Sequence, residues 1–407
     1  MSFQTGLSGL SAAAKNLDVI GNNIANSNTV GAKSSRAEFA AVVAAAIGPS
    51  GGGGAAGDGI GVQVATVSQQ FSQGTINITG NNLDCAVNGG GFFELQQKDG
   101  SSAYTRDGQF KLDANGNLIT NSGANVMGYN IVNGVPSSTP TKMVVPSGAP
   151  IAAKPTDTIT ATFNLDARAA IYNPATNTPP GTTYGTTLNA FDSQGVPVPV
   201  QLFFVKTGTD AWDVYNGDPN PTAVPAATNL GSMAFDTAGN ITTSPATLNM
   251  NLTSTNTNIG TFPATLNVSG ATQYGTSFAI SDLTQNGYTA GTLTGVSISD
   301  QGIITTRYSN GQSQSNGQLA LADFRNVQGL KPVGQNNWVE TSTSGQPIHG
   351  HPAQGNFGTI NSGSLEASNV DLTAELVSMM TAQRDYQSNA QTIKTQDTVM
   401  QTLVNLR

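Results

Sequence analysis

Helical apolar patterns occur at both ends of this 407-residue chain and constrain its fold more than any other feature. At the N-terminus, apolar or small residues recur at spacings of three and four, which places them on one stripe of an α-helix. These are Phe3, Leu7, Leu10, Ala14, Leu17, Gly21 and Ile24. The C-terminus repeats the spacing at Leu372, Leu376, Met379, Tyr386, Ala390, Ile393, Met400 and Val404. Since a lone amphipathic helix leaves its stripe uncovered, we expect the two ends to meet as a helix pair.

Helix-breaking and helix-capping residues mark where these two helices stop and start. The segment "DVIGNNIANSNTVGAKSS" begins as an apolar pattern and then turns into Asn, Ser and Gly. Asn and Gly tolerate left-handed backbone geometry and bond freed backbone groups, so this segment is predicted to be the helix exit. Its residues are Asn22, Asn23, Asn26, Asn28 and Gly31. Ser368 followed by Asp371 resembles a capping box and starts a second helix at about residue 370, which extends to about 406.

The long middle of the chain is predicted to be all-β. Gly, Asn, Asp and Pro interrupt it about every ten residues, which is the spacing expected of short strands and turns. Four segments place a turn containing Asp and Gly between two apolar runs, which indicates a hairpin. They are "KLDANGNLIT" from Lys111, "AFDSQGVPVPV" from Ala190, "AFDTAGNITT" from Ala234 and "SISDQGIITT" from Ser297. Their unequal spacing favours shared turn chemistry over a repeat architecture.

Gly-rich and Pro-rich segments predict a nested order of domains. The expected fold is mainly β with paired, coiled-coil-like terminal helices and two β domains, the central one inserted into the other. Ile47–Gly61 is interpreted as a flexible excursion and Val144–Asp157 as a linker. The predicted parts are a terminal helical domain (1–32 and 367–407), a connecting segment (33–70 and 355–366), an inner β domain (71–149 and 288–354) and an outer β domain (150–287).

The composition argues against several classes of partner. Charged residues make up 10% of the chain, against a usual share of about 25%. The net charge is −8, so the basic footprint of a nucleic-acid or anionic-membrane binder is missing. No apolar run is long enough to span a bilayer, and the N-terminus lacks the pattern of a cleaved signal peptide. We expect no nucleic acid as a partner and no membrane insertion.

Motifs for catalysis or for cofactor and metal binding were sought without a positive signal. The Gly-rich run lacks the Gly-Lys-Ser/Thr ending of a phosphate-binding loop. The segment from Asp113 begins like a calcium loop, but Leu118 stands where such a loop requires Gly. His349 and His351 would supply only two metal ligands, and no nucleophile elbow or paired-carboxylate signal accompanies them. The lone Cys85 excludes an intramolecular disulfide and is interpreted as a small buried thiol. We therefore predict no catalytic, cofactor-binding or metal-binding residues.

Long stretches of the chain resemble the bacterial flagellar rod and hook axial proteins. The two ends carry this resemblance, with "SGLSAAAKNLDVIGNNIANSNTVGAKSSRAEF" at the start and "GSLEASNVDLTAELVSMMTAQRDYQSNAQTIKTQDTVMQTLVNLR" at the finish. Central segments such as "LDCAVNGGGFFEL" and "AFDSQGVPVPVQLFFVKTGTDAWDVY" fit the same family. The chain departs from the family pattern at Ala32, where an aromatic residue is common, and in the length of the Gly-rich segment Pro49–Gly61.

The resemblance implies a helical polymer in which the terminal helices line an inner tube and the β domains stack outward. It also implies export without signal cleavage, followed by assembly beneath a cap. Carried over position by position, the residues expected to pack in this core tube come from both helices. They are Leu7, Leu10, Leu17, Ile20, Ile24, Leu376, Met379, Met380, Tyr386, Ile393, Met400 and Leu403.

The large central insertion favours the hook members of the family over the distal rod subunits, which share the ends. The expectation is a structural subunit, not an enzyme, that self-assembles into a flexible curved tube transmitting torque from rod to filament. Expected partners are further copies of the chain, the flagellar rod, the hook cap, the hook–filament junction proteins and the flagellar type III export apparatus. The expected location is extracellular, in a hook attached to the basal body.

Three alternatives stay open at this point. A distal rod subunit of the basal body shares the terminal helices but should lack so large an insertion. An extracellular adhesin would not need striped helices at both ends. A secreted polysaccharide-active enzyme would need a convergent acid and base in a cleft, for which the residues give no signal.

Overall fold

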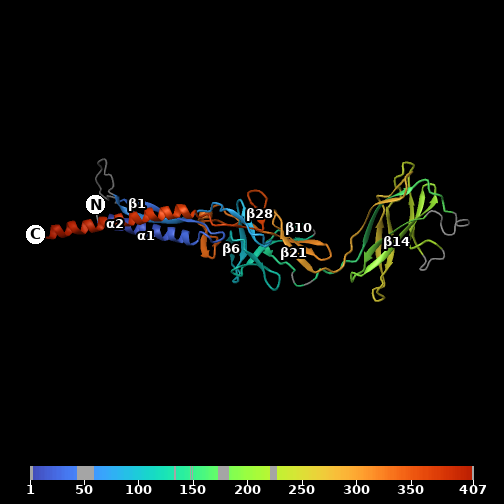
Figure 1. Ribbon diagram of the computed structural model, residues 1–407, viewed down its shortest axis with the longest axis horizontal. Coiled ribbons are helices and arrows are strands. Elements are labelled where there is room, and N and C mark those ends of the chain that lie inside the picture. Colours follow the sequence, from blue (N-terminus) through green and yellow to red (C-terminus); the bar gives the residue numbers. More distant parts are fainter. Residues whose placement is uncertain are drawn as a thin grey trace. The chain divides into compact units, whose positions relative to one another are not determined.

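The computed structural model describes residues 3–43, 59–132, 134–146, 148, 150–172, 183–220 and 227–405 (Figure 1). Most of the Gly-rich segment predicted as a flexible excursion lies outside these residues. The chain divides into two compact units: unit 1 is Met1–Gly148, Gly295–Arg307 and Ser313–Arg407, and unit 2 is Ala149–Thr294 and Tyr308–Gln312. The predicted fold class, mainly β with helices at both termini and one β part inserted into the other, is confirmed.

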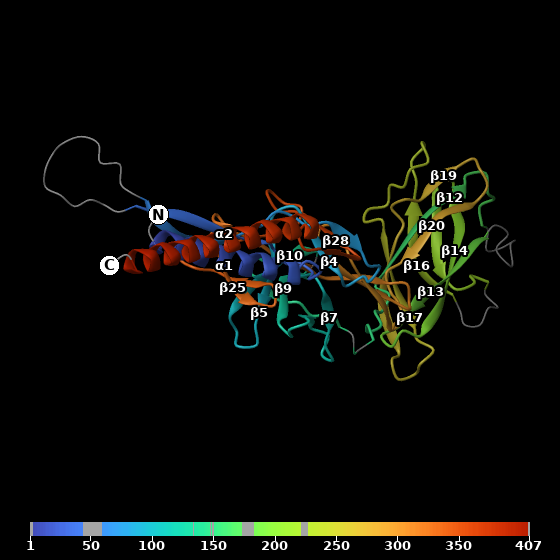
Figure 2. The ribbon, with the colours of Figure 1, turned by 60° about the vertical axis from the view of Figure 1, so that its left-hand side comes forward.

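The two terminal helices of unit 1 pack side by side in antiparallel orientation (Figures 1 and 2). Helix α1 spans Phe3–Ala25 and helix α2 spans Leu372–Asn405. Glycine permits their close approach, because a Cβ added to Gly6 would lie 3.0 Å from Cγ1 of Ile393. A Cβ added to Gly9 would lie 2.8 Å from Oδ1 of Asn389. Small residues of α1 thus allow the two helices to pack closely.

The start of α2 corrects the predicted cap. Asp371 is itself the N-cap, since its Oδ1 accepts backbone N–H groups of Thr373 at 2.9 Å and Ala374 at 3.1 Å. Ser368, expected to be the cap, instead accepts the N–H of Val370 at 3.3 Å, ahead of the helix. A carboxylate at the N-cap satisfies two free donors and also complements the helix dipole.

A two-stranded antiparallel hairpin follows α1 and packs against it. It consists of β1 (Ser35–Val43) and β2 (Gly59–Gln69), and we call it the connecting hairpin. The N–H of Val62 donates to Oγ of Ser8 at 3.3 Å, which joins β2 to α1. The segment after the helix exit therefore has a regular ladder of its own.

The rest of unit 1 is a set of antiparallel β-ladders that we call the inner β domain. In its largest sheet, β5 pairs with both β6 and β9, and β26 pairs with β6. Apolar side chains such as Phe93, Leu95 and Leu319 fill its core. The strands are β3 (Ile76–Ile78), β4 (Cys85–Asn88), β5 (Phe92–Gln96), β6 (Ser102–Thr105), β7 (Phe110–Leu112), β8 (Leu118–Thr120), β9 (Asn125–Val132), β10 (Val135–Pro136), β11 (Thr141–Lys142), β21 (Leu293–Ile298), β22 (Ile303–Tyr308), β23 (Ser313–Leu319), β24 (Leu321–Asp323), β25 (Lys331–Gly334), β26 (Asn337–Val339), β27 (Ile348–Gly350), β28 (Thr359–Ser362) and β29 (Ser364–Glu366). A short 3-10 helix, η1, spans Val327–Gly329.

Two small ladders bring the C-terminal part of the chain back to its first third. Strand β28 pairs with β4, and β29 pairs with β3, both antiparallel. The chain that leads into α2 is thereby held beside the chain that follows the connecting hairpin. These ladders position the junction between the helix pair and the inner β domain.

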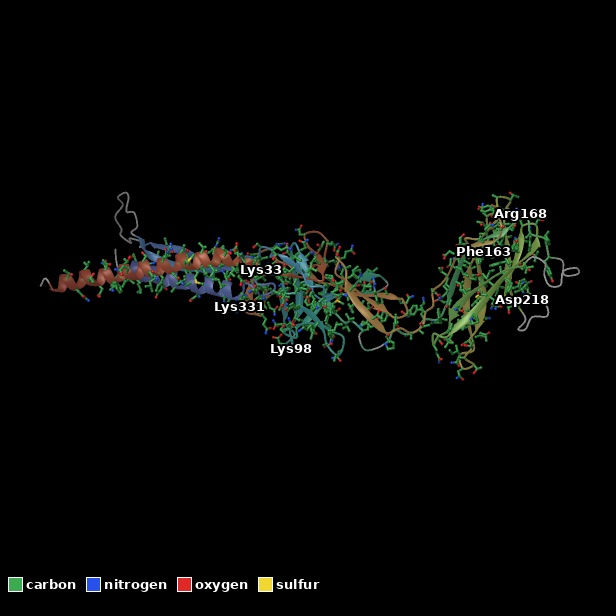
Figure 3. All side chains as sticks on the ribbon, viewed as in Figure 1. Lys33, Lys98, Phe163, Arg168, Asp218 and Lys331 are labelled. Atoms are coloured by element: carbon green, nitrogen blue, oxygen red, sulfur yellow. The ribbon has the colours of Figure 1, made fainter. Side chains whose placement is uncertain are left out.

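Unit 2 is a β-sandwich with its own core. One antiparallel sheet has the order β13-β14-β15-β16, and the other has the order β17-β18-β12-β19 with β20 also paired to β12. Burial alternates strictly along β12, which places Phe163, labelled in Figure 3, against Phe204 of the other sheet at a ring distance of 4.4 Å. The strands are β12 (Thr158–Asp166), β13 (Thr183–Phe191), β14 (Pro197–Gly208), β15 (Ala211–Asn216), β16 (Thr228–Ala234), β17 (Thr247–Thr253), β18 (Thr261–Asn267), β19 (Thr272–Tyr274) and β20 (Ala279–Gln285).

The four predicted turns share one chemistry. Their glycines, Gly116, Gly195, Gly239 and Gly302, all have φ between 73° and 84°. Three residues before each of the first three glycines an Asp carboxylate accepts two backbone N–H groups of the turn. In the fourth turn Ser299 stands at this position, and its hydroxyl accepts one N–H at 3.2 Å. The similarity among the segments is turn chemistry, as predicted.

The boundary of unit 2 differs from the expected end at residue 287. The N–H of Ile151 donates to the carbonyl of Gly291 at 2.8 Å, and Lys154 bonds the carbonyl of Tyr288 at 3.0 Å. Ser309 donates its N–H to Thr292 at 2.9 Å, which draws residues 308–312 into the same unit. Backbone pairing at the base of the insertion therefore extends unit 2 past the predicted boundary.

The burial of Cys85 on β4 predicts an unreactive thiol. Its exposure is 0%, and burial, helped by the charge of Asp84, raises the pKa of the thiol to about 12. Because the thiolate is the reactive form, we expect no reaction with a disulfide reagent such as DTNB at pH 8 in the folded chain. The same titration in guanidinium chloride should release one equivalent, and fast modification of the folded chain would contradict the buried placement.

Candidate functional site

Apolar side chains remain exposed along the helix pair. Leu7 is 52% exposed, Met380 53% and Met400 56%, although each is a large apolar residue on a regular helix. We call the exposed apolar residues of the two helices the assembly face. They are Phe3, Leu7, Leu372, Leu376, Val377, Met380, Tyr386, Val399 and Met400. Large apolar side chains that stay exposed on regular helices are typical of a protein–protein contact.

The residues predicted for the core tube divide into three groups in a single chain. Leu7, Leu376, Met380, Tyr386 and Met400 are exposed. Leu10, Leu17, Ile24, Met379 and Ile393 are half-buried, and Ile20 is buried. The side chain of Leu403 lies outside the described residues.

The face of α1 that is buried within the chain is not the predicted leucine stripe. It consists of Gly6, Ala12, Ala13, Val19, Ile20 and Asn23. Small residues on this face let α2 and the connecting hairpin approach, while the larger stripe points elsewhere. The predicted packing of that stripe in a tube stays a prediction, since a single chain does not test it.

Helix α2 also extends beyond the start of α1 (Figure 2). Because Ile393 lies against Gly6 near the beginning of α1, the following turns of α2 have little of α1 left to cover them. Val399 is accordingly 48% exposed. This end of α2 needs another chain if its apolar side chains are to be buried.

The helix exit combines one obligatory glycine with one buried asparagine. Gly31 has a φ of +69°, and a Cβ added there would lie 2.7 Å from the backbone nitrogen of Asp107. Asn23 is buried, and its side-chain amide makes two hydrogen bonds with the backbone of Ser35. Nδ2 donates to the carbonyl of Ser35 at 2.8 Å, and Oδ1 accepts the N–H of Ser35 at 2.8 Å. The same Nδ2 donates to Oε1 of Glu375 on α2 at 2.9 Å. These contacts join α1, the connecting hairpin and α2.

The other predicted exit residues act locally. Asn26 bonds the carbonyl of Asn22 through its backbone N–H at 3.1 Å and through Nδ2 at 3.0 Å, which closes the last turn of α1. Asn28 is exposed. The described positive-φ residues include none of the four asparagines, so the expected left-handed geometry comes from Gly31 instead.

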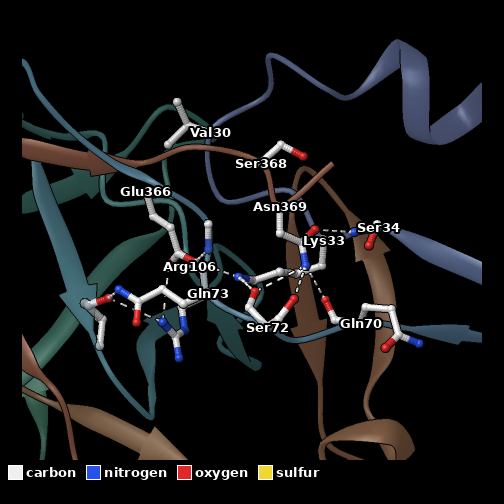
Figure 4. Close-up of polar contacts among 12 residues, drawn as sticks. Val30, Lys33, Ser34, Gln70, Ser72, Gln73, Arg106, Glu366, Ser368 and Asn369 are labelled. Atoms are coloured by element: carbon white, nitrogen blue, oxygen red, sulfur yellow. Dashed lines mark hydrogen bonds and ion pairs between the residues drawn. The ribbon is translucent and has the colours of Figure 1, made fainter. Parts of the chain in front are cut away.

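A buried ion cluster, which sequence reasoning missed, lies where these segments meet (Figure 4). Oε1 of Glu366 accepts from Nζ of Lys33 at 2.6 Å and from the N–H of Gly74 at 2.9 Å. Oε2 of the same carboxylate accepts from Nη1 of Arg106 at 3.2 Å. The side chains of Glu366, Lys33 and Arg106 are 0%, 1% and 7% exposed. We call these three side chains the Glu366 cluster.

Backbone carbonyls accept further hydrogen bonds from the two cations, while Nε of Arg106 is buried without a hydrogen-bond partner. Lys33 also donates to the carbonyl of Ser72 at 2.8 Å, and Arg106 donates to the carbonyl of Gly89 at 2.8 Å. The Arg106 guanidinium lies 5.2 Å from the centre of the Phe92 ring. Burial lowers the pKa of Lys33 and of Arg106, although the Glu366 carboxylate opposes both shifts. Figure 3 places Lys33 where the helix pair meets the inner β domain.

Asn369 adds a second link, just before α2. Its Oδ1 accepts the N–H of Ser34 at 2.7 Å, and its Nδ2 donates to the carbonyl of Gln70 at 2.7 Å and to Oγ of Ser72 at 2.9 Å. It thus bonds both ends of the connecting hairpin. A signal did exist for the charged residues of this junction, since Lys33 follows the first helix and Glu366 precedes the second in a chain poor in charge.

The described residues contain no group of three or more His, Cys, Asp or Glu side chains that could hold a metal ion. His349 contacts Oε2 of Glu94 at 3.1 Å, while the ring of His351 lies against Tyr129.

Across the described part of the chain, no helix combines the length and apolar character needed to cross a membrane.

Terminal helices with exposed apolar side chains, carried on β domains, are the features of a structural subunit. Four family models match this chain along its length. "Flagella basal body rod protein" matches residues 3–33 and "Flagellar hook protein FlgE/F/G D1 domain" matches 86–167. "Flagellar basal body protein FlaE D2 domain" matches 164–288, and "Flagellar basal body rod FlgEFG protein C-terminal" matches 361–406.

Full-length relatives narrow the family. Flagellar hook protein FlgE of Escherichia coli (strain K12) is 41% identical over 420 residues, with 100% of each chain covered. FlgE of Rhizobium meliloti (strain 1021) is 33% identical over 426 residues, covering 100% of this chain and 98% of the relative. The chain belongs to the flagellar hook protein family. The resemblance found in the sequence is thereby confirmed, and the distal rod alternative is not favoured.

A solved structure shows the same fold. The crystal structure of Helicobacter pylori flagellar hook protein FlgE2 superposes with a TM-score of 0.57, covering 72% of this chain and 100% of that chain. The sequence identity is 14%, so this likeness supports the fold alone.

The close contact at Gly31 predicts a costly substitution with a matched control. Gly31→Ala adds a methyl group at positive φ that collides with the backbone of Asp107, whereas Gly80, at a φ of +76°, has nothing within 4 Å of an added Cβ. Both variants should lose about 1 kcal/mol of unfolding free energy from the backbone conformation. Gly31→Ala should lose roughly 2 kcal/mol more from overpacking. Urea denaturation measures the difference, and equal losses would refute the close contact.

Proposed function

We propose that this chain is the structural subunit of the bacterial flagellar hook and that copies associate through their terminal helices into a tube. The observation that supports this most directly is the assembly face. Moving large apolar side chains out of water lowers the free energy of the protein. A single chain leaves these side chains exposed. In the tube, residues such as Leu7, Leu376 and Met400 would be covered by neighbouring copies.

We further propose that the tube is curved and flexible and passes torque from rod to filament. Bending requires outer contacts that lengthen and shorten as the polymer turns. With 10% charged residues, the chain has few groups for strong directional ion pairs between copies. Contacts among Thr, Asn, Gln and Gly side chains would let one register give way to another at small cost. Unit 2, which packs around its own core, is the part we assign to these contacts.

The proposed partners follow from this role. They are other copies of the chain, the flagellar rod, the hook cap, the hook–filament junction proteins and the flagellar type III export apparatus. The proposed location is outside the cell, in a hook attached to the basal body. We assign the chain no catalytic activity and no cofactor, because its proposed work is mechanical.

The role of the assembly face is tested by Met380→Lys. Met380 is 53% exposed, so the free energy of unfolding of the monomer should change by no more than about 0.5 kcal/mol. Tube formation, followed by sedimentation and electron microscopy, should be lost, because every contact between copies would bury an unpaired ammonium. Val135→Lys on β10 is the matched control, since Val135 is 67% exposed on the inner β domain. Normal tubes from Met380→Lys would argue against this face.

The mechanical role of unit 2 is tested by its removal. Ile151 and Gly291 bond each other across an isolated bridge, so a short Gly-Ser linker can replace residues 152–290 without moving either end. We expect this variant to form tubes whose curvature or bending stiffness, measured in electron micrographs, differs from that of the full chain. The same linker inserted at the exposed turn of Gly100 is the control. Unchanged curvature and stiffness would remove unit 2 from the mechanism.

A further inference from the structure

The Glu366 cluster joins three segments at a large desolvation cost. Lys33 and Glu366 are separated by 333 positions in sequence, and Arg106 and Glu366 by 260. All three charges leave water, and two positive groups share one carboxylate. Buried ion groups of this kind often contribute less to stability than apolar residues of the same volume would. Their presence is better explained by a requirement for one defined geometry.

The contacts around Glu366 are directional at every point. Its two carboxylate oxygens face different segments, with Lys33 and Gly74 on one and Arg106 on the other. The main chain of Glu366 is fixed as well, because its carbonyl accepts the N–H of Gly31 at 2.8 Å. Apolar surfaces can slide past one another, but a shifted segment would leave buried donors or acceptors unpaired. The observed register pairs both carboxylate oxygens of Glu366 and its main-chain carbonyl.

One member of the cluster is anchored in the inner β domain. Arg106 follows directly after β6, and its guanidinium lies over Phe92, which packs at ring distances of 5.7 Å from both Phe71 and Trp338. The other two members lie where the chain enters or leaves this domain: Lys33 precedes the connecting hairpin, and Glu366 is the last residue of β29, from which the chain continues to α2. The cluster therefore ties two departing segments to one rigid point.

We propose that the Glu366 cluster is a positioning device, which sets the direction in which the connecting hairpin and the start of α2 leave the inner β domain. In a tube, the same device gives every copy the same angle between its helices and its inner β domain; this consequence rests on the proposed function. The positioning itself is a property of the single chain.

The test measures a distance within the monomer. Nitroxide labels at Thr66→Cys on β2 and Lys111→Cys on β7 occupy exposed positions on either side of the cluster, while Cys85 stays buried. In Lys33→Met, pulsed electron resonance should show a distance distribution about twice as wide as in the parent. Urea denaturation should shift little, because methionine keeps the apolar stem and removes the surplus buried charge. Arg36→Met, whose side chain is 68% exposed, is the matched control and should leave the width unchanged.

A second variant guards against loss of fold. Glu366→Gln keeps the size of the side chain but removes the charge that Lys33 and Arg106 share, and it should broaden the same distribution. In a Trp212→Phe background, the near-ultraviolet signal of Trp338 reports whether the inner β domain is folded. An unchanged width in folded Lys33→Met would overturn the proposal. Loss of the Trp338 signal in both variants would also overturn it, because the cluster would then supply stability. A failure of the parent chain to form tubes would refute the proposed function and leave this result standing.

Discussion

The junction of unit 1 depends on one buried carboxylate. Glu366 accepts hydrogen bonds from three segments that are distant in sequence, and its side chain has no contact with water. An unpaired charge at this depth would cost several kcal/mol, so the segments must arrive together or not at all. The helix exit, the connecting hairpin and the start of α2 all take their places around this group.

Close helix packing requires small residues on α1, whereas the assembly face consists of large apolar residues. Helix α1 carries the two kinds of residue on different sides. Its small residues, such as Gly6 and Ala12, face the rest of the chain and permit close approach. Two of its larger residues, Phe3 and Leu7, remain exposed, while Leu10, Leu17 and Ile24 are half-buried. Contacts within the chain thus leave part of the apolar surface of α1 exposed, and we propose that association between copies covers it. The buried polar junction supplies the orientation that such a lightly packed helix pair could not define by itself.

Sequence patterns predicted local features well, because local features depend on neighbours in the chain. The spacing of apolar residues placed both helices, and Asp with Gly placed the four hairpin turns. The predicted helix exit spans the end of α1 at Ala25, and the individual contacts of its asparagines were not predicted. Asn23 reaches across to Ser35 and Glu375, whereas Asn28 is exposed. The cap of α2 was misplaced by one turn, because Ser and Asp cap equally well and only geometry chooses between them.

What the sequence determined by itself was the kind of subunit: two striped helices, a β middle, little charge, and residues that match the flagellar hook protein family. Tertiary structure alone decided which apolar residues stay exposed and how the segments are joined. The exposure of a side chain depends on what packs against it in three dimensions. An ion pair between residues 333 positions apart produces no periodic pattern in the sequence. Lys33, Arg106 and Glu366 became a cluster only when the fold brought their segments together.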